Sequence, residues 1–249
     1  MPKDRSSIIL VQPQMGENIG AAARAMLNFG ITDLRLVAPR DGWPNKRAVD
    51  LSAGAFDLLP PAQVFETLED ATSDLQHLYA TTARTRDMIK PVFTPRSAAV
   101  NAVERTNQGQ NIGFVFGRES CGLTNDETAM CHSIIQIPAN PDFSSLNLGQ
   151  AVLLIGHELF QVQDQTPARV LDMGESIPAP QSAFEGFFAR LESEMDTGGF
   201  FTSDDVRPTI VRNVRNIFTR AELSEQEVNT LQGIISALIG NKISGRKKA

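Results

Sequence analysis

The chain has 249 residues, 41% of them hydrophobic, enough for one large domain or for one domain with a small appendage. The formal net charge of −6 excludes a general polycation, and no apolar run is long enough to cross a bilayer. The two cysteines, Cys121 and Cys131, form no CxxC motif and no Cys/His cluster, so neither a disulfide framework nor a zinc site is indicated.

Strand and helix patterns alternate along the first two thirds of the chain. Residues 7–11 form a short apolar run typical of a buried parallel strand, and they leave too little room before them for a signal peptide, so we expect a cytoplasmic protein. Residues 18–30 show helical spacing that ends at Gly30. Further strands are predicted at 33–38, 78–82, 111–117 and 133–138, and further helices near 95–108, 124–131 and 147–163. This alternation predicts an α/β domain with a mainly parallel sheet over residues 1–163.

The remaining third has a different texture. Residues 164–182 contain three prolines and little periodicity, which is typical of a linker. Residues 183–249 are predicted to form a small all-helical C-terminal module, with helices near 183–196, 207–220 and 224–239. The last helix begins with Ser224 and Glu227 in the positions of a capping box.

Three polar, glycine-bearing turns lie where a predicted strand is followed by a helix, the place where open α/β sheets bind ligands. They cover residues 18–24, 116–122 and 143–151. In the first, Arg24 follows Asn18 by six residues and is expected to point toward the same side of the helix. An ordinary helix cap and an ordinary surface charge are the alternative there.

The other two turns also have a purely structural alternative. Gly117 and Gly122 permit close approach of a ligand or simply a tight turn, in which Arg118 and Glu119 form an ion pair. The third turn places Ser144, Ser145 and Asn147 before the helix at 147–163. Either a serine caps that helix, or the three side chains form a polar rim around a small molecule with Ile137 and Leu148 as apolar walls.

Other chemistries lack the residues that they require. The sequence contains no Gly-x-Ser-x-Gly motif, and the surroundings of its three histidines do not favour catalysis. No ligands occur at a spacing that suits a metal ion. Binding of an organic cofactor therefore accounts best for the three turns.

In these motifs the chain resembles the SpoU/TrmH-type methyltransferases of the SPOUT superfamily. The resemblance covers residues 7–163 and includes the motifs at 18–24, 117–123 and 137–148 in order. Within the family the chain looks most like the enzymes that methylate the ribose 2′-oxygen of cytidine or uridine at anticodon-loop position 32 of tRNA, and residues 212–223 support this. A ribosomal RNA, another tRNA nucleotide, or a non-catalytic RNA-binding dimer remain as alternatives.

The resemblance implies a deep trefoil knot in the C-terminal part of the α/β domain, a homodimer with shared active sites, and S-adenosylmethionine as the cofactor, without a metal or a membrane. The residues that match the cofactor-binding positions of the family are Thr81, Thr82, Ala83, Gly117, Ile137, Ser144, Ser145 and Leu146, and Thr82 stands where close relatives are expected to have serine. Those that match its catalytic polar set are Arg24, Ser145, Asn18, Glu119 and Asn147. We expect Arg24 to orient the ribose hydroxyl and to stabilise developing negative charge.

Two basic segments are candidates for RNA contact. Four arginines without an intervening acid, which we expect to meet phosphates, lie within residues 207–220: Arg207, Arg212, Arg215 and Arg220. A solvated helix face is the alternative. The second candidate is the loop that contains Trp43 with Arg40, Lys46 and Arg47.

Overall fold

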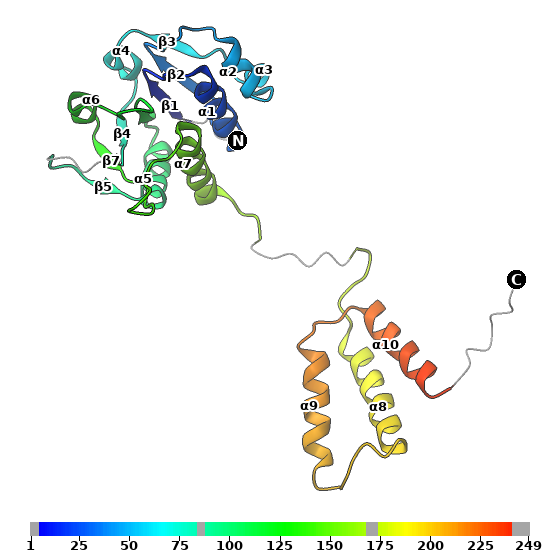
Figure 1. Ribbon diagram of the computed structural model, residues 1–249. Helices are drawn as coiled ribbons and strands as arrows, with labels where there is room; N and C mark the ends of the chain where they lie inside the picture. Colours follow the sequence, from blue (N-terminus) through cyan, green and yellow to red (C-terminus); the bar gives the residue numbers. More distant parts are fainter. Residues whose placement is uncertain (1–4, 84–87, 168–173, 241–249) are drawn as a thin grey trace, which may run out of the picture. The chain divides into compact units, whose positions relative to one another are not determined.

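The computed structural model describes residues 5–83, 88–167 and 174–240. It divides into two compact units, Met1–Thr166 and Pro167–Ala249 (Figure 1). Within the described residues, no helix is both long enough and apolar enough to span a bilayer.

The first unit is built on a seven-stranded sheet in the order β3-β2-β1-β6-β4-β7-β5, and every pair of neighbouring strands is parallel. The strands are β1 (Ser6–Val11), β2 (Asp33–Val37), β3 (Gln63–Phe65), β4 (His77–Thr81), β5 (Val92–Phe93), β6 (Ile112–Phe116) and β7 (Ser133–Ile135). The five predicted strands are confirmed, although β7 ends at Ile135 rather than at residue 138. The two strands that the sequence did not predict are three and two residues long and lie at the sheet edges, too short for a recognisable pattern.

Helices cover both faces of this sheet, which explains why its strands are apolar on both sides (Figure 1). Alternate residues of a strand point to opposite faces, and in β1 Ile8 packs with one core cluster while Ile9 packs with another. The first cluster is closed by α1 (Gly16–Asn28), α5 (Pro95–Asn107) and α7 (Leu148–Gln163), together with α2 (Lys46–Leu51) and α3 (Ala55–Leu58). The second is closed by α4 (Leu68–Thr72) and by the segment around α6 (Asn125–Met130).

Because the whole sheet is parallel, the carboxyl ends of its strands share one edge. The loops that follow β1, β2, β4, β6 and β7 all leave the sheet there. The fold thus brings together the three polar turns, which are far apart in the sequence.

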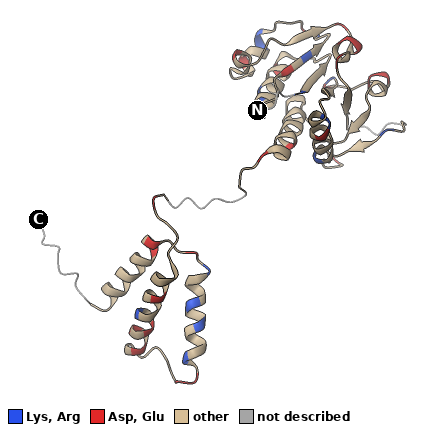
Figure 2. Cartoon of the chain, turned by 180° about the vertical axis from the view of Figure 1, so that it is seen from behind, with Lys and Arg blue, Asp and Glu red and all other residues tan. Residues whose placement is uncertain are grey.

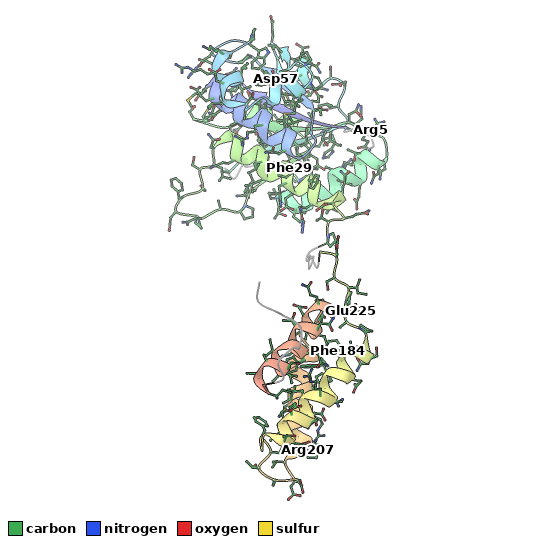
Figure 3. The ribbon with its side chains drawn as sticks, turned by 90° about the vertical axis from the view of Figure 1, so that its right-hand side faces the viewer. Arg5, Phe29, Asp57, Phe184, Arg207 and Glu225 are labelled. Carbon is green, nitrogen blue, oxygen red and sulfur yellow. The ribbon has the colours of Figure 1, made fainter. Side chains whose placement is uncertain are left out.

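The second unit consists of three helices, α8 (Gln181–Thr197), α9 (Arg207–Thr219) and α10 (Glu225–Leu238). Its core is small, and Figure 3 shows Phe184 among the helices that enclose it. The capping box of Ser224 and Glu227 is confirmed at the start of α10. Ala179 donates a backbone hydrogen bond to Leu223, so the end of the segment predicted as a linker is attached to this unit.

Candidate cofactor and active site

A cavity of about 330 Å³ lies at the carboxyl ends of β4, β6 and β7, a size in the range of small-molecule sites. All eight residues expected to hold the cofactor line it, and so does Leu148, the second expected apolar wall. Ser120 and Cys121 also line the cavity, although no role was expected for them from the sequence. Their position between Gly117 and Gly122 could have predicted this, because a loop that folds back on itself brings all its residues close to the cavity.

Gly117 allows this loop to fold back against the strand. The backbone of Arg118 and that of Gly122 exchange two hydrogen bonds, of 3.2 and 2.8 Å. A side-chain carbon on residue 117 would lie 2.2 Å from the backbone carbon of Gly122 and from the backbone nitrogen of Leu123. Only glycine therefore permits this cavity wall.

Thr81, at the end of β4, shows that the cavity is suited to a polar ligand. Its Oγ1 is buried and, among the buried side-chain polar atoms of the described residues, is the one without a hydrogen-bond partner. A buried hydroxyl without a partner is costly, and the residue that carries this one lines the cavity, where a polar ligand would lie close to it.

Arg118 and Glu119 do not form the ion pair that their adjacency suggested. The Arg118 guanidinium donates instead to both carboxylate oxygens of Glu127 in α6, at 3.0 and 2.9 Å, and to Gln12 at 2.9 Å. The hydrogen bond to Glu127 raises the pKa of Arg118. Burial opposes ionisation of Glu127, but hydrogen bonds from Arg118 and Thr124 outweigh it and lower the pKa of Glu127. Arg118 and Glu127 are therefore both charged, and their ion pair anchors the cavity loop to α6.

Glu119 belongs to a hydrogen-bond network that joins all three polar turns. Its carboxylate accepts from the backbone nitrogen of Gln14 at 2.9 Å and from Nδ2 of Asn18 at 2.6 Å. Oδ1 of Asn18 accepts from Nδ2 of Asn147 at 2.8 Å, and Oδ1 of Asn147 accepts from the backbone nitrogen of Gly149 at 2.8 Å. Three of the five expected catalytic residues are therefore in direct contact, and they fix the start of α1 and of α7 to the cavity loop.

The structure also shows which residues cap α1 and α7, for which the sequence suggested Asn18 and one of the two serines. The N-cap of α1 is Met15, and Asn18 lies buried inside the helix, so Asn18 is not a cap. The N-cap of α7 is Asn147, not Ser144 or Ser145. Both serines are exposed in the cavity lining, where they are available to a ligand.

Arg24 does not lie on the side of α1 that carries Asn18, contrary to the expectation. Six residues of an α-helix turn through about 600°, which leaves the two side chains about 120° apart. Asn18 is buried, whereas Arg24 is exposed and is not among the residues that line the cavity. Within the part of the chain that the structure describes, Arg24 has no hydrogen-bond or ion-pair partner, so its guanidinium is available to a group outside this chain.

The four arginines of α9 fall into two pairs, because acids of α8 approach two of them. Arg207 binds Asp196 at 2.6 Å, and Arg215 binds Glu192 at 2.7 Å and Glu185 at 3.1 Å. Arg212 donates only within its own helix, and Arg220 makes no side-chain hydrogen bond or ion pair with another described residue. Helix α9 carries basic residues and no acidic ones, whereas acidic residues lie on the other helices of this unit (Figure 2). The prediction overlooked this neutralisation because the acids come from another helix.

The family model described as the SpoU rRNA Methylase family matches residues 5–157, the span that contains all three turns. The chain belongs to this family. A second model, described as the C-terminal domain of the tRNA methyltransferase TrmJ, matches residues 182–248. The described residues contain no group of three or more histidine, cysteine or acidic side chains that could hold a metal ion.

Two relatives of this SpoU methylase cover nearly its whole length, and a third shares the fold over part of it. It is 38% identical over 240 residues to the tRNA (cytidine/uridine-2′-O-)-methyltransferase TrmJ of Citrobacter koseri, covering 93% of this chain and 95% of that protein. The crystal structure of TrmJ from Z. mobilis ZM4 is 46% identical, with a TM-score of 0.81 and coverage of 94% and 98%. AviRb from Streptomyces viridochromogenes, solved in complex with the cofactor AdoMet, shares the fold at 19% identity, a TM-score of 0.52 and coverage of 63% and 57%.

Proposed function

We propose that this SpoU methylase transfers a methyl group from S-adenosylmethionine to a ribose 2′-hydroxyl of tRNA. The observation that carries the proposal is that the eight residues expected to bind the cofactor, drawn from three separate segments, line one cavity. The names of the relatives, tRNA (cytidine/uridine-2′-O-)-methyltransferases, support the substrate and the reaction. Position 32 of the anticodon loop is part of the proposal and rests on the sequence resemblance.

The residues present fit the cofactor. The tight wall at Gly117 and the unpartnered hydroxyl of Thr81 are features of a built small-molecule site, and the AdoMet complex of AviRb supports the identity of the ligand. When bound, S-adenosylmethionine would supply a methyl group already activated by the positive sulfonium. The protein is then left with two tasks, which are to orient the ribose oxygen and to stabilise the negative charge that develops on it.

Arg24 is the proposed group for the second task. An arginine side chain keeps its charge at physiological pH, so it acts by electrostatic stabilisation and orientation rather than as a base. Because Arg24 is exposed and outside the lining of its own chain's cavity, we propose that it serves the cavity of a partner subunit. Ser145 remains the proposed contact to the ribose, whereas Asn18, Glu119 and Asn147 act as positioning residues.

A homodimer is supported by apolar side chains that are exposed on α7. Leu153 and Phe160 of α7, seven residues apart and so on one face of the helix, are 40% and 44% exposed. Phe29, at the end of α1, lies against this helix (Figure 3), with its ring 5.7 Å from His157 and 5.9 Å from Phe160. We propose that this surface, formed by α1 and α7, is the subunit interface.

Three further parts of the proposal have different support. The trefoil knot is part of the proposal and rests on the sequence resemblance. Contact of α9 with tRNA is supported by the guanidinium groups of Arg212 and Arg220, which pair with no acid among the described residues, while Arg207 and Arg215 are assigned to holding α9 on α8. The cytoplasm is the proposed location because tRNA is the proposed substrate.

The direct experiment incubates the protein with total tRNA and methyl-labelled S-adenosylmethionine and maps the modified ribose by mass spectrometry. Label at nucleotide 32 is the expected result. Label in ribosomal RNA or at another tRNA nucleotide would replace the target but keep the reaction. Absence of transfer to any RNA, with RNA binding retained, would instead indicate a non-catalytic RNA-binding dimer and overturn the proposal.

Cofactor binding can be measured independently through the cysteines. Cys121 is exposed in the cavity lining, whereas Cys131 is buried, and burial raises the pKa of the Cys131 thiol to about 12. Iodoacetamide should therefore modify Cys121 alone, and S-adenosylmethionine should slow that modification. An Arg24→Ala variant should lose methyl transfer but keep this protection.

The shared active site is tested by mixing two inactive variants. Arg24→Ala lacks the guanidinium, and Gly117→Ala lacks a functional cavity, so neither homodimer should transfer methyl groups. A mixed dimer would contain one intact cavity facing one intact Arg24, and activity should return on mixing. Continued inactivity of mixtures in which subunit exchange is demonstrated would exclude action of Arg24 across the interface.

A further inference from the structure

A second basic surface lies outside the proposed reaction centre, in the loop between β2 and α2 and in the first turn of α2. Arg40, Lys46 and Arg47 are all exposed there. Arg40 forms an exposed ion pair with Asp41, and Arg47 forms one with Glu17. Such pairs in solvent contribute little to stability, so they do not explain why the cations are there.

The backbone that carries these cations is firmly held. The backbone nitrogen of Arg40 donates to the carbonyl of Pro13 at 3.2 Å. Oδ1 of Asn45 accepts from the backbone nitrogens of Arg47 and Ala48 at 3.0 and 3.3 Å. Asn45 also lies so close to α1 that a side-chain carbon on Gly16 would be 2.2 Å from its Oδ1. The basic side chains therefore project from a fixed frame attached to the start of α1.

The loop lies at the same edge of the sheet as the cavity. The strand order places β2 two positions from β6, and the two strands run in the same direction. At about 4.8 Å between neighbouring strands, the carboxyl end of β2 is roughly 10 Å from that of β6, where the cavity opens.

Arg47 lies beside the face of α1 that carries Arg24. Glu17 and Arg24 are seven residues apart on α1, close to two full turns, and so share one face of the helix. Arg47 reaches Glu17 at 3.3 Å, which places the first turn of α2 beside that face. Arg47 and the proposed catalytic guanidinium thus lie beside the same face of α1.

The positions of Lys46 and Arg47 within α2 are unfavourable for the helix itself. The first turn of a helix favours acidic residues, and that of α2 has none. Lys46 makes no hydrogen bond or ion pair with another described residue. Residues that break a local rule without a compensating contact are expected where function requires them.

We propose that Arg40, Lys46 and Arg47 bind phosphates of the RNA substrate and hold the strand beside the cavity. This inference rests on the proposed function. Cations fixed beside a reaction centre position an RNA backbone without reading its sequence. The ring of Trp43, which is partly buried, packs on Phe56 at 5.2 Å and supports the loop that carries these cations.

The test compares Lys46→Ala and Arg47→Ala with Arg5→Ala. Arg5 is also an exposed arginine, but it precedes β1 and therefore lies at the opposite edge of the sheet (Figure 3). Binding of tRNA is titrated at several salt concentrations. Each loop variant should weaken binding several-fold at low salt and reduce the slope of log K against log salt by about 0.7–0.9. Arg5→Ala should change neither quantity.

Lys46→Glu separates binding from stability. It should weaken tRNA binding more than Lys46→Ala does, while the thermal midpoint stays level or rises because an acid suits the first turn of α2. Protection of Cys121 by S-adenosylmethionine should persist in every variant. Loop variants that bind tRNA with the affinity and salt slope of Arg5→Ala would overturn the inference, whereas a wild-type protein that methylates no tRNA would overturn the proposed function instead.

Discussion

The Glu119 network ends at two backbone nitrogens, those of Gly149 and Gln14, which can only donate. They determine which atom donates and which accepts in every hydrogen bond between them. The backbone nitrogen of Gly149 can only donate, so Oδ1 of Asn147 must accept and Nδ2 must donate to Asn18. Asn18 then donates to Glu119, which also accepts from the backbone nitrogen of Gln14. Residue 119 must therefore accept with both of its side-chain oxygens.

Glu119→Gln preserves shape and volume but places an amide donor against the Nδ2 of Asn18. The network is part-buried, so the unpaired donor should lower the free energy of unfolding by roughly 1–3 kcal/mol. Asn18→Asp should cost at least as much, because it places two carboxylates where Nδ2 of Asn18 now lies 2.6 Å from Glu119. Both single variants should also reduce the protection of Cys121 by S-adenosylmethionine, since the network positions the cavity loop.

The double variant, Asn18→Asp with Glu119→Gln, exchanges the amide and the carboxylate and restores every bond. The new carboxylate at position 18 accepts from Asn147 and from the new amide at position 119, whose carbonyl oxygen still accepts from the backbone of Gln14. The coupling free energy should therefore be favourable and comparable in size to the cost of a single variant. Urea unfolding followed through Trp43, the one tryptophan of the chain, measures all four proteins. Strictly additive losses in the double variant would show that the network does not have this arrangement.

Three other outcomes are expected. Gly117→Ala should abolish cofactor protection of Cys121, because the added methyl would lie 2.2 Å from backbone atoms of the cavity loop, and unaltered protection would contradict this assignment. Arg212→Ala should lower the slope of log K for tRNA binding against log salt by about 0.7–0.9. Arg215→Ala, which breaks contacts to α8, should instead lower the thermal midpoint of the second unit. The reverse pattern would disprove the division of the α9 arginines into an RNA-binding pair and a structural pair. Burial, with smaller contributions from Arg105 and His132, lowers the pKa of His77 to about 4. As the pH falls, His77 therefore binds a proton in the unfolded chain before it does so in the folded protein. The free energy of unfolding should decrease between about pH 6.5 and pH 4, by about 1–2 kcal/mol at pH 5. Urea unfolding at pH 7.5 and 5 should show a smaller difference for His77→Gln than for the wild type.

The long elements and the cavity residues were predictable because their causes are local. The five predicted strands are short segments rich in apolar and β-branched residues, and the helices bounded by Gly30 and by the box of Ser224 and Glu227 carry their end signals within a few residues. The motif residues lie at strand ends, and a parallel sheet must bring such ends to one edge. The two-residue strand β5 and the six-residue helix α2 were not predicted because neither shows a clear period along the chain, and both form because neighbouring elements support them.

The sequence by itself determined the class of fold, the family and the set of residues around the cavity, since each depends on pattern and order along the chain. The tertiary structure alone decided what each polar side chain contacts. It paired Arg118 with Glu127, made Asn147 the cap of α7, left Arg24 exposed on the outer face of α1, and neutralised Arg207 and Arg215 through α8. The physical reason is that charge and hydrogen bonding act over a few ångströms of space, and the partners involved come from separate segments of the chain.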